Sequence, residues 1–450
     1  MIATPESREA DLIGLIGELY PICRSITGEG VRETLRRIAQ RLPIAVHEVP
    51  SGTQVFDWTV PREWNIRDAW IKNLNGDRVV DFRECNLHVV SYSVPVRKRM
   101  PISELKEHLH TLPDHSSWIP YKTSYYREAW GFCVSADQAR ALADSEYDVC
   151  IDSTLADGHL TYGEFYLPGD SAEEVLFSTH VCHPSLCNDN LSGIAVAVFL
   201  ARWLTTLAHR RFSYRFLFIP GTIGSITWLA RNRDRLRAIR HGLVLTGLGS
   251  RGGLVYKRSR IGTAVIDRAA AHVLKHTAGE NEVREFIPYG YDERQYCSPG
   301  VNLAVGCLSR TPFGEYPEYH TSADNMDFVE AGQLEGSFMA CQSIVRVLED
   351  EARYVSRMQM CEPQLGRRGL YSSMGGAGEA RVQEMAMLWV LNFSDGHHSL
   401  LDIAERSGLS FESIRRATVL LHEKGLLERM QTDGSAAFDA LHGEIGESAR

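Results

Sequence analysis

Between residues 131 and 350, short apolar runs alternate with longer stretches that are apolar on one helical face. The runs are too short for helices and indicate buried strands at 175–178, 214–219 and 242–245. The stretches that separate them predict helices at 191–207, 225–239 and 266–276. Strands that alternate with helices in this way predict an α/β fold, a mixed and mostly parallel sheet flanked by helices.

The segment 44–130 has a different pattern. Residues 86–94 alternate between polar and apolar, which is typical of a strand. Tryptophans are concentrated in the same segment, at Trp58, Trp64, Trp70 and Trp118. We therefore predict an inserted β-rich domain at 44–130, between two parts of a main domain at 1–43 and 131–360. Two roles for its aromatic residues stay open, lining a substrate cleft and packing a small core.

Helical spacing marks both ends of the main domain. Residues 8–41 predict two helices with a break at Thr27 and Gly28. Residues 327–357 predict a closing helix, and the glycine-rich stretch 362–380 predicts a linker.

The C-terminal segment, 381–440, has the pattern of a winged helix-turn-helix domain. Helices are expected at 384–393, 399–409 and 411–424, with a wing from Gly425. The last helix carries Arg415 and Arg416, but Glu412 and Glu423 offset their charge. DNA reading needs a basic helix, so we expect this module to serve an intramolecular or oligomerisation role instead.

Composition narrows the class of protein. The 450 residues are 44% hydrophobic and 23% charged, as in soluble globular proteins. The net charge of −9 argues against broad binding to nucleic acid. No apolar run is long enough to span a membrane, and the first residues lack a secretory signal. With ten scattered cysteines, these features predict a cytoplasmic protein with reduced thiols.

Two segments about 130 residues apart carry candidate chemistry. His180 and His183 follow the first predicted strand, and Asp189 precedes the next helix. His320 lies in the second segment. Imidazole and carboxylate are donors that Zn²⁺ prefers, so convergence of these side chains would build a zinc site. The alternative is that the histidines are ordinary loop residues and that Asp189 caps a helix.

The order of these motifs resembles that of the co-catalytic zinc aminopeptidases and their glutaminyl cyclase relatives. The shared features are a strand ending in histidine, Asp-Asn-x-Ser-Gly at 189–193 and His-Thr-x-x-Asp at 320–324. The resemblance implies that His180, Asp189 and His320 are metal ligands. It also implies that Asp189 matches the carboxylate that bridges two metals in the two-zinc members.

Over nearly its full length, the chain is similar to a subgroup of bacterial aminopeptidase-like proteins with an inserted domain and a C-terminal winged helix. These proteins are often found with polysaccharide or secondary-metabolite genes. The segments that carry the similarity are 23–28, 51–58, 60–64, 124–133 and 220–224.

The chain departs from the aminopeptidase pattern at three positions. Gly221 and Thr222 stand where that family has two adjacent glutamates, the general base and a metal ligand. Thr246 lies near the place of a later aspartate ligand. One zinc ion is therefore expected, with two as the alternative, and His183 is expected to fill a vacated ligand position.

The missing glutamate leaves the general base to be found elsewhere. Metal-assisted hydrolysis needs a group that takes a proton from water. Glu293, Glu315 and Glu318 are candidates, and Glu293 is favoured because 291–293 resembles the acidic substrate-side turn of the family. The alternative for Glu293 is a surface carboxylate in a polar loop. Asp292, Glu315 and Glu318 are expected to bind substrate, and Glu318 is alternatively a partner of His320.

The expected function is a zinc-dependent hydrolase of an amide bond, an aminopeptidase-like enzyme or a deacylase. Its substrate would be a small aminoacyl or short peptide molecule, or an intermediate linked to carbohydrate or secondary metabolism. We also expect a homo-oligomer that binds neither DNA nor membranes. The alternative is a metal-binding protein that has lost catalysis and acts in binding or regulation through its winged helix.

Overall fold

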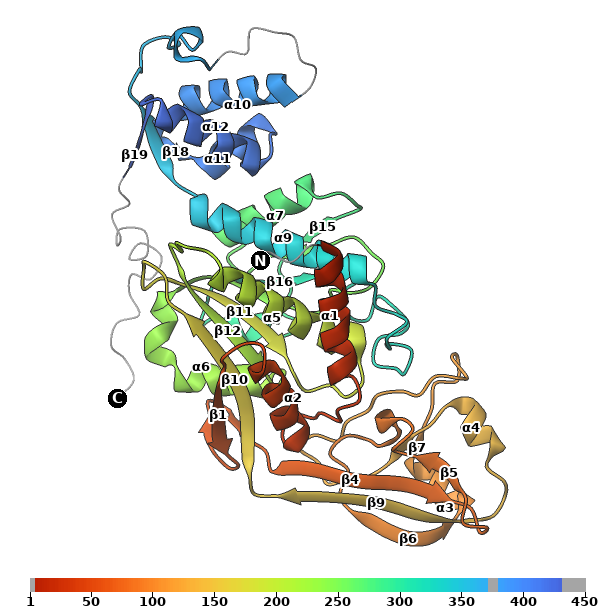
Figure 1. Ribbon diagram of the computed structural model, residues 1–450. Coiled ribbons are helices and arrows are strands. Elements are labelled where there is room, and N and C mark those ends of the chain that lie inside the picture. Colours follow the sequence, from red (N-terminus) through yellow and green to blue (C-terminus); the bar gives the residue numbers. More distant parts are fainter. Residues whose placement is uncertain (1–4, 371–378, 431–450) are drawn as a thin grey trace. The chain divides into compact units, whose positions relative to one another are not determined.

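The computed structural model describes residues 5–370 and 379–430 (Figure 1). The chain divides into two compact units, Met1–Glu349 and Asp350–Arg450. Within the described ranges, no helix combines the length and the apolar character needed to cross a membrane.

An eight-stranded sheet forms the centre of the first unit, in the order β1-β10-β12-β11-β13-β16-β14-β15. The four central strands are parallel to one another, and β10 and β14 run antiparallel to their central neighbours. This arrangement confirms the predicted mixed sheet. In sheet order, the strand bounds are Ala45–Pro50, His159–Leu167, Ser213–Ile219, Glu174–His180, Ile239–Leu245, Val305–Ser309, Val255–Lys257 and Glu282–Arg284.

Helices flank this sheet, as the hydrophobic pattern predicts. Every residue of β11 and β12 is buried, which explains why their sequences form apolar runs without alternation. The helix α5 packs against β11 and β13, and α1 packs against α5. The helix predicted at 225–239 ends earlier, and a 3₁₀ turn follows it at Arg233–Ala238. The helix bounds are Pro5–Leu19 (α1), Glu29–Ala39 (α2), Ser192–Thr205 (α5), Ile223–Arg231 (α6), Val265–His276 (α7), Glu293–Tyr296 (α8) and Ala331–Asp350 (α9).

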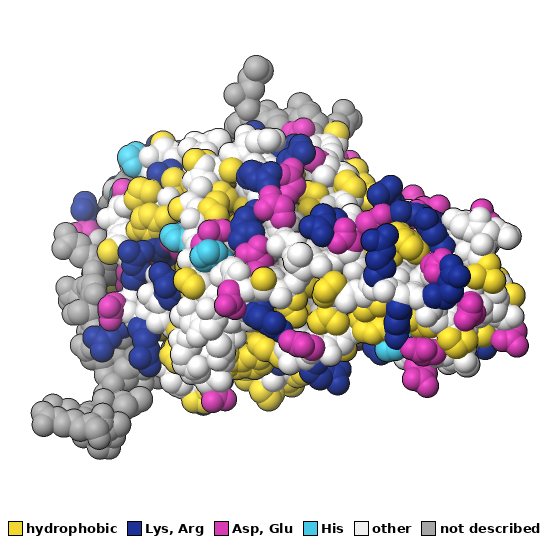
Figure 2. Space-filling model, turned by 90° about the horizontal axis from the view of Figure 1, so that it is seen from below, with side chains coloured by type: hydrophobic (Ala, Val, Ile, Leu, Met, Phe, Trp, Pro, Cys, Tyr) yellow, Lys and Arg dark blue, Asp and Glu magenta, His cyan; other side chains and the backbone are white. Residues whose placement is uncertain are grey.

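The insertion is built on an antiparallel sheet of four strands, in the order β5-β4-β9-β6 (Figure 1). Figure 2 shows acidic and basic side chains interspersed over this part of the molecule, where Arg67 pairs with Asp152 and Arg99 with Asp148. The strand bounds are Arg78–Asp81, Glu63–Lys72, Glu146–Ala156 and Val96–Pro101.

The boundaries between the two sheets do not fall at the expected residues 44 and 130. The strand β1 belongs to the main sheet, whereas β9 belongs to the sheet of the insertion. Residues 86–94 do not form the predicted strand, because Asn86–His88 is a 3₁₀ turn and Tyr92 has a positive φ of 72°. Residues 87–93 are all buried, so the polar positions in this run do not mark a solvent-facing side.

The segment Cys23–Gly28 packs against the insertion. The hydroxyl of Thr27 lies 2.6 Å from the hydroxyl of Tyr92 and accepts a hydrogen bond from the backbone of Trp64. Gly28 has a φ of 94°, and a Cβ there would lie 2.0 Å from the carbonyl oxygen of Trp64. Only glycine fits this backbone conformation and this close approach.

The second unit confirms the predicted winged helix-turn-helix. Three helices, α10, α11 and α12, pack on one another beside a three-stranded sheet in the order β18-β17-β19. The predicted cap is present, since the Ser410 hydroxyl accepts a hydrogen bond from the backbone of Ser413. The bounds are Glu379–Phe393 (α10), Leu400–Ser407 (α11), Phe411–Glu423 (α12), Arg353–Ser356 (β17), Asp395–Ser399 (β18) and Leu427–Arg429 (β19).

The second unit begins earlier than the expected residue 381. The strand β17 supplies the middle of its sheet, so the closing helix of the main domain ends at Asp350 rather than at residue 357. Part of the expected linker, 371–378, and the end of the expected module, 431–440, lie outside the described residues.

Candidate metal centre

The first histidine of the site is the last residue of β11, at the carboxyl edge of the main sheet. A loop then leads to a π-helical turn, Cys187–Leu191, that carries Asp189 and runs into α5. Ligands of open α/β sheets bind at this edge. The turn is held by Asp324, whose carboxylate accepts hydrogen bonds from the backbone of Asn188 at 2.6 Å and of Asp189 at 2.9 Å. Burial raises the pKa of Asp324 to about 7.

The structure brings the four predicted ligands together around the carboxylate of Asp189. The Nε2 of His180 lies 3.6 Å from its Oδ1, and the Nε2 of His183 lies 3.6 Å from its Oδ2. The Nε2 of His320 lies 3.1 Å from Oδ2. Donor atoms of His180, His183 and Asp189 all lie within 4.8 Å of one another. His320 falls outside that group of three and joins the cluster through Asp189.

Several polar atoms of this cluster are buried without a hydrogen-bond partner among the described residues. They are both ring nitrogens of His180, together with Oδ2 of Asp189 and Nε2 of His320, which lie 3.1 Å apart but without hydrogen-bond geometry. Buried polar atoms in proteins are almost always satisfied, so converging unpaired donors fit an ion that binds between them. Nitrogen and oxygen donors in this number suit Zn²⁺.

The charge states of the cluster also fit a cation. Burial raises the pKa of Asp189, but the nearby histidines outweigh this effect and hold it well below its usual range. Burial lowers the pKa of His183 well below its usual range. An ionised carboxylate beside a neutral imidazole is the form in which these side chains bind metals.

Strained backbone accompanies the site. His320, Thr222 and Ser185 have positive φ angles of 55°, 62° and 41°, which residues other than glycine rarely adopt. The insertion fixes the backbone of His320, because the backbone of Tyr121 donates a hydrogen bond to the His320 carbonyl at 2.7 Å. Strain of this kind persists where surrounding contacts fix the backbone for a function.

Two other segments fix the loop around His183. The guanidinium of Arg24, which is fully buried, donates from Nε to the His183 carbonyl at 2.9 Å. The side chain of Asn190 accepts a hydrogen bond from the backbone of His183, also at 2.9 Å. The motif that begins at Cys23 therefore supports the metal centre as well as the insertion.

The positions where the chain departs from the aminopeptidase pattern lie around the cluster. The hydroxyl of Thr246 donates to the Asp189 carbonyl at 2.8 Å and so supports its backbone. The backbone of Thr222 donates to Oδ1 of Asp292 at 2.6 Å, and Ser225 donates to the same oxygen at 3.0 Å. The carboxylate of Asp292 therefore lies beside Gly221 and Thr222, the two positions where the aminopeptidase pattern has glutamates. Burial raises the pKa of Asp292.

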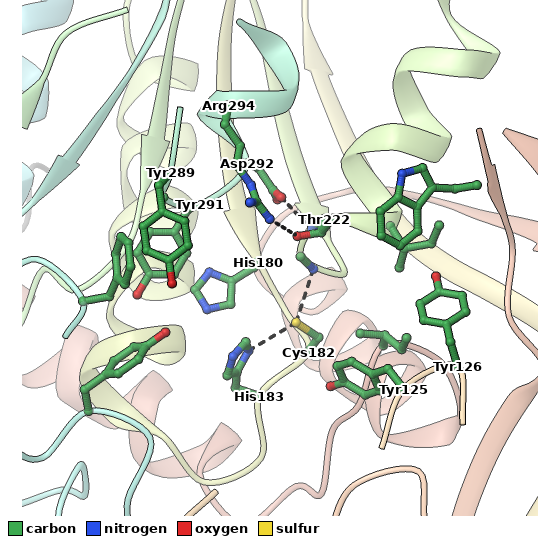
Figure 3. Close-up of a pocket in the computed structure, with 17 residues that line it drawn as sticks. Tyr125, Tyr126, His180, Cys182, His183, Thr222, Tyr289, Tyr291, Asp292 and Arg294 are labelled. Carbon is green, nitrogen blue, oxygen red and sulfur yellow. Dashed lines mark hydrogen bonds between the residues drawn. The ribbon is translucent and has the colours of Figure 1, made fainter. Parts of the chain in front are cut away.

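A cavity of about 410 Å³ opens beside the histidines. Figure 3 shows His180, His183, Asp292 and Arg294 facing it from different segments. The insertion contributes part of the wall, and the hydroxyl of Tyr291 reaches behind His180 to donate to Oδ1 of Asp189 at 2.6 Å. Seven aromatic side chains line the cavity: Trp58, Tyr125, Tyr126, Tyr289, Tyr291, Phe313 and Tyr319.

Three of the predicted acidic residues do not line this cavity. Glu293 is fully buried, and its Oε1 lies 2.5 Å from Nζ of Lys257. Glu315 is exposed and pairs with Arg284, and Glu318 is half-buried. These positions do not support Glu293 as the base or the two others as substrate ligands. Asp292 alone of the predicted acids faces the cavity.

Sequence reasoning missed three residues that lie at the site. Tyr291 belongs to the acidic turn, but only the fold shows that its hydroxyl reaches Asp189. Arg294 follows that turn by one residue and lines the cavity. Tyr121 lies in the insertion, and its ring lies 5.2 Å from the His183 ring and 5.0 Å from the His320 ring. No local signal in the sequence places these rings together.

The fold of the first unit is that of the zinc aminopeptidases. A zinc aminopeptidase from Bacillus subtilis is 12% identical and superimposes with a TM-score of 0.54, over 77% of this chain and 95% of that one. A peptidase M28 precursor from Shewanella amazonensis is 12% identical, with a TM-score of 0.55 and the same coverage. At this identity the likeness concerns the fold alone.

Residues 13–351 match the family described as a domain of unknown function (DUF4910), and the chain belongs to that family. Residues 352–429 match the model described as winged helix-turn-helix.

One relative from Clostridium acetobutylicum is named for polysaccharide biosynthesis and an aminopeptidase-like domain. It is 50% identical over 418 residues, which cover 93% of this chain and 96% of the relative. A crystal structure from the same organism, named as a peptidase, is 49% identical with a TM-score of 0.90, over 95% of this chain and 97% of that one.

Proposed function

We propose that the protein is a zinc-dependent hydrolase of an amide bond in a small acylated or aminoacyl substrate. The observation that carries this proposal is the cluster of His180, His183, Asp189 and His320, with unpaired buried donor atoms, at the wall of an aromatic cavity. The cavity volume is in the range of small-molecule sites. The polysaccharide biosynthesis in the name of the C. acetobutylicum relative supports a carbohydrate-linked substrate.

Asp189, His180 and His183 would hold one zinc ion, with His320 adjacent to it. Two ions are the alternative, because His180 faces one oxygen of Asp189 and His320 faces the other. Bound zinc polarises a substrate carbonyl and lowers the pKa of the water that it binds toward neutral. Tyr291 fixes the orientation of Asp189 through its hydrogen bond.

We assign the general base to Asp292 rather than to Glu293. Asp292 faces the cavity, and its Oδ1 is held by Thr222 and Ser225. Because burial raises its pKa, this carboxylate is a better proton acceptor than an exposed aspartate. Glu293 is fully buried beside Lys257 and does not line the cavity, so it is not placed to meet a substrate water.

Two matched substitutions test the base. We expect Asp292→Asn to lower kcat on a responsive amide at least about a hundredfold, as for loss of a general base, with zinc content intact. Glu293→Gln breaks a buried ion pair, so it should lower the melting temperature while the folded fraction keeps its kcat. Stopped assays across a panel of aminoacyl and acyl amides, paired with elemental analysis, give both readings. The assignment fails if Asp292→Asn retains full turnover.

The second candidate is a metal-binding protein without hydrolytic activity. Gly221 and Thr222, which replace two glutamates of the related pattern, favour it. Zinc that binds tightly while no member of the amide panel is turned over would select this candidate.

We further infer that the winged helix does not read DNA. Arg415 and Arg416 of α12 both pair with Glu412, so their charges are partly neutralised. A role within the chain or between copies of it fits this surface better. The ten free cysteines support a reducing compartment, the cytoplasm.

A further inference from the structure

We propose that Arg294 binds an oxyanion of the substrate, a carboxylate or a phosphate, beside the metal centre. The proposal names a substrate class for the proposed hydrolase and rests on that function only for the reaction, not for the binding.

Arg294 lies in the short helix α8 and lines the cavity. Figure 3 shows its side chain extending toward Thr222, above His180. Its Nη2 lies 3.4 Å from the Thr222 hydroxyl, which is a long contact for a guanidinium. Its Nε is buried and has no hydrogen-bond partner among the described residues. The guanidinium therefore lies at the cavity with a hydrogen-bond donor that has no partner among the described residues.

Arg294 also has no counter-ion among the residues that the structure describes. No carboxylate of the described ranges lies within 4.0 Å of its guanidinium. Two other enclosed cations of this unit have carboxylate partners: Arg215 bonds Glu164 and Glu174, and Lys257 contacts Glu293. Because an enclosed charge is costly without a partner, a ligand that supplies one gains affinity.

The remaining charges at the cavity favour an anion. Asp292 is the one acidic side chain among the lining residues, and it already accepts hydrogen bonds from Thr222 and Ser225. Arg24 adds a second cation behind His183, where it bonds backbone carbonyls rather than carboxylates. A substrate ammonium, which an aminopeptidase must bind, has no uncommitted carboxylate in this lining.

Guanidinium and carboxylate or phosphate match in geometry, because two parallel hydrogen bonds can form. The aromatic walls make the surroundings of this pairing less polar than bulk water, which strengthens it. The structure thus indicates a substrate that carries its anionic group a short distance from the scissile bond, such as an N-acyl amino acid or a phosphorylated acylamino sugar.

Calorimetric titration of the zinc-loaded, full-length protein tests the proposal without any turnover. The probes are N-acetylglycine, its neutral analogue N-acetylglycinamide, and inorganic phosphate. We expect one or both anions to bind more tightly than the neutral amide, and the preferred anion identifies the substrate group. Arg294→Gln should weaken that binding at least about tenfold, as for loss of a hydrogen bond to a charged group. Arg294→Lys, which keeps the charge, should restore part of it.

Arg235→Gln is the matched control, because Arg235 is exposed and lies outside the cavity lining. It should bind the anions as the wild type does. Anion binding that is equal in wild type and Arg294→Gln, or lost only on removal of zinc, would overturn the proposal, because the metal alone would then hold the anion. Arg294-dependent binding without hydrolysis of any amide would leave the anion site standing and reject the hydrolase.

Discussion

At the scale of single residues, the site is organised around the carboxylate of Asp189. Three imidazoles and one phenol approach its two oxygens, and backbone N–H groups that donate to the Asp324 carboxylate fix the turn that carries it. Such partners set the orientation of a metal ligand and its affinity for the ion.

The hydroxyl of Tyr291 should therefore matter for zinc although it is not itself an expected ligand. We expect Tyr291→Phe to weaken zinc binding about tenfold, because Asp189 loses its oriented hydrogen bond. Competition with a chromophoric chelator measures this. Tyr166→Phe is the control, since that ring is 43% exposed on β10 and absent from the cavity lining. Equal zinc affinity in both variants would show that Tyr291 does not support the site.

The sequence predicts which ligand candidates converge better than which carboxylate faces the cavity. His180, His183, Asp189 and His320 stand in motifs whose spacing is visible along the chain. The roles of Asp292 and Glu293 depend on which of two adjacent carboxylates turns toward the cavity. That choice is made by Lys257 and Thr222, which contact them from other segments. Long-range contacts of this kind leave no local pattern.

At the scale of elements, burial explains which of the predicted strands are confirmed. The strands β11, β12 and β13 are enclosed by other elements, and their apolar runs predict them directly. The strand β9 passes from the sheet of the insertion toward β10 of the main sheet, so its membership depends on pairing partners. Composition cannot show such pairing, and the expected boundary at residue 130 misses it.

An ion pair links α2 to the start of β4, where the insertion leaves the main sheet. The guanidinium of Arg32 donates to both oxygens of Glu63, at 2.8 and 2.7 Å. The hydrogen bonds from Arg32 lower the pKa of Glu63 to about 2, despite the opposing effect of burial. A folded-state pKa below the unfolded value means stability that is present at neutral pH and lost in acid.

We expect Glu63→Gln to cost about 1–3 kcal/mol of unfolding free energy at pH 7. Because the depressed pKa of Glu63 favours folding only while the carboxylate is ionised, the deficit should shrink as the pH falls from about 4.5 toward 2. Denaturant titration at several pH values measures it. Glu128→Gln is the control: its carboxylate is 68% exposed beside Arg62, so the cost should stay below about 1 kcal/mol. A deficit that grows in acid would contradict the assignment.

At the scale of the whole molecule, every candidate ligand and every residue of the cavity lies in the first unit. The insertion supplies Trp58, Tyr125 and Tyr126 to the cavity wall, so it takes part in the site rather than forming a separate module. The winged helix contributes none of these residues. The residues that match its model, 352–429, all belong to the second unit. All residues of the candidate metal site therefore belong to the first unit.

Zinc content of the purified protein, by elemental analysis after dialysis, tests the central claim most directly. The variants are His183→Ala and, as the control, His276→Ala, whose imidazole is exposed at the end of α7. We expect about one zinc per chain in the wild type and the control, and little in His183→Ala, because three protein donors are needed to hold the ion. No zinc in the wild type, or unchanged zinc in His183→Ala, would contradict it.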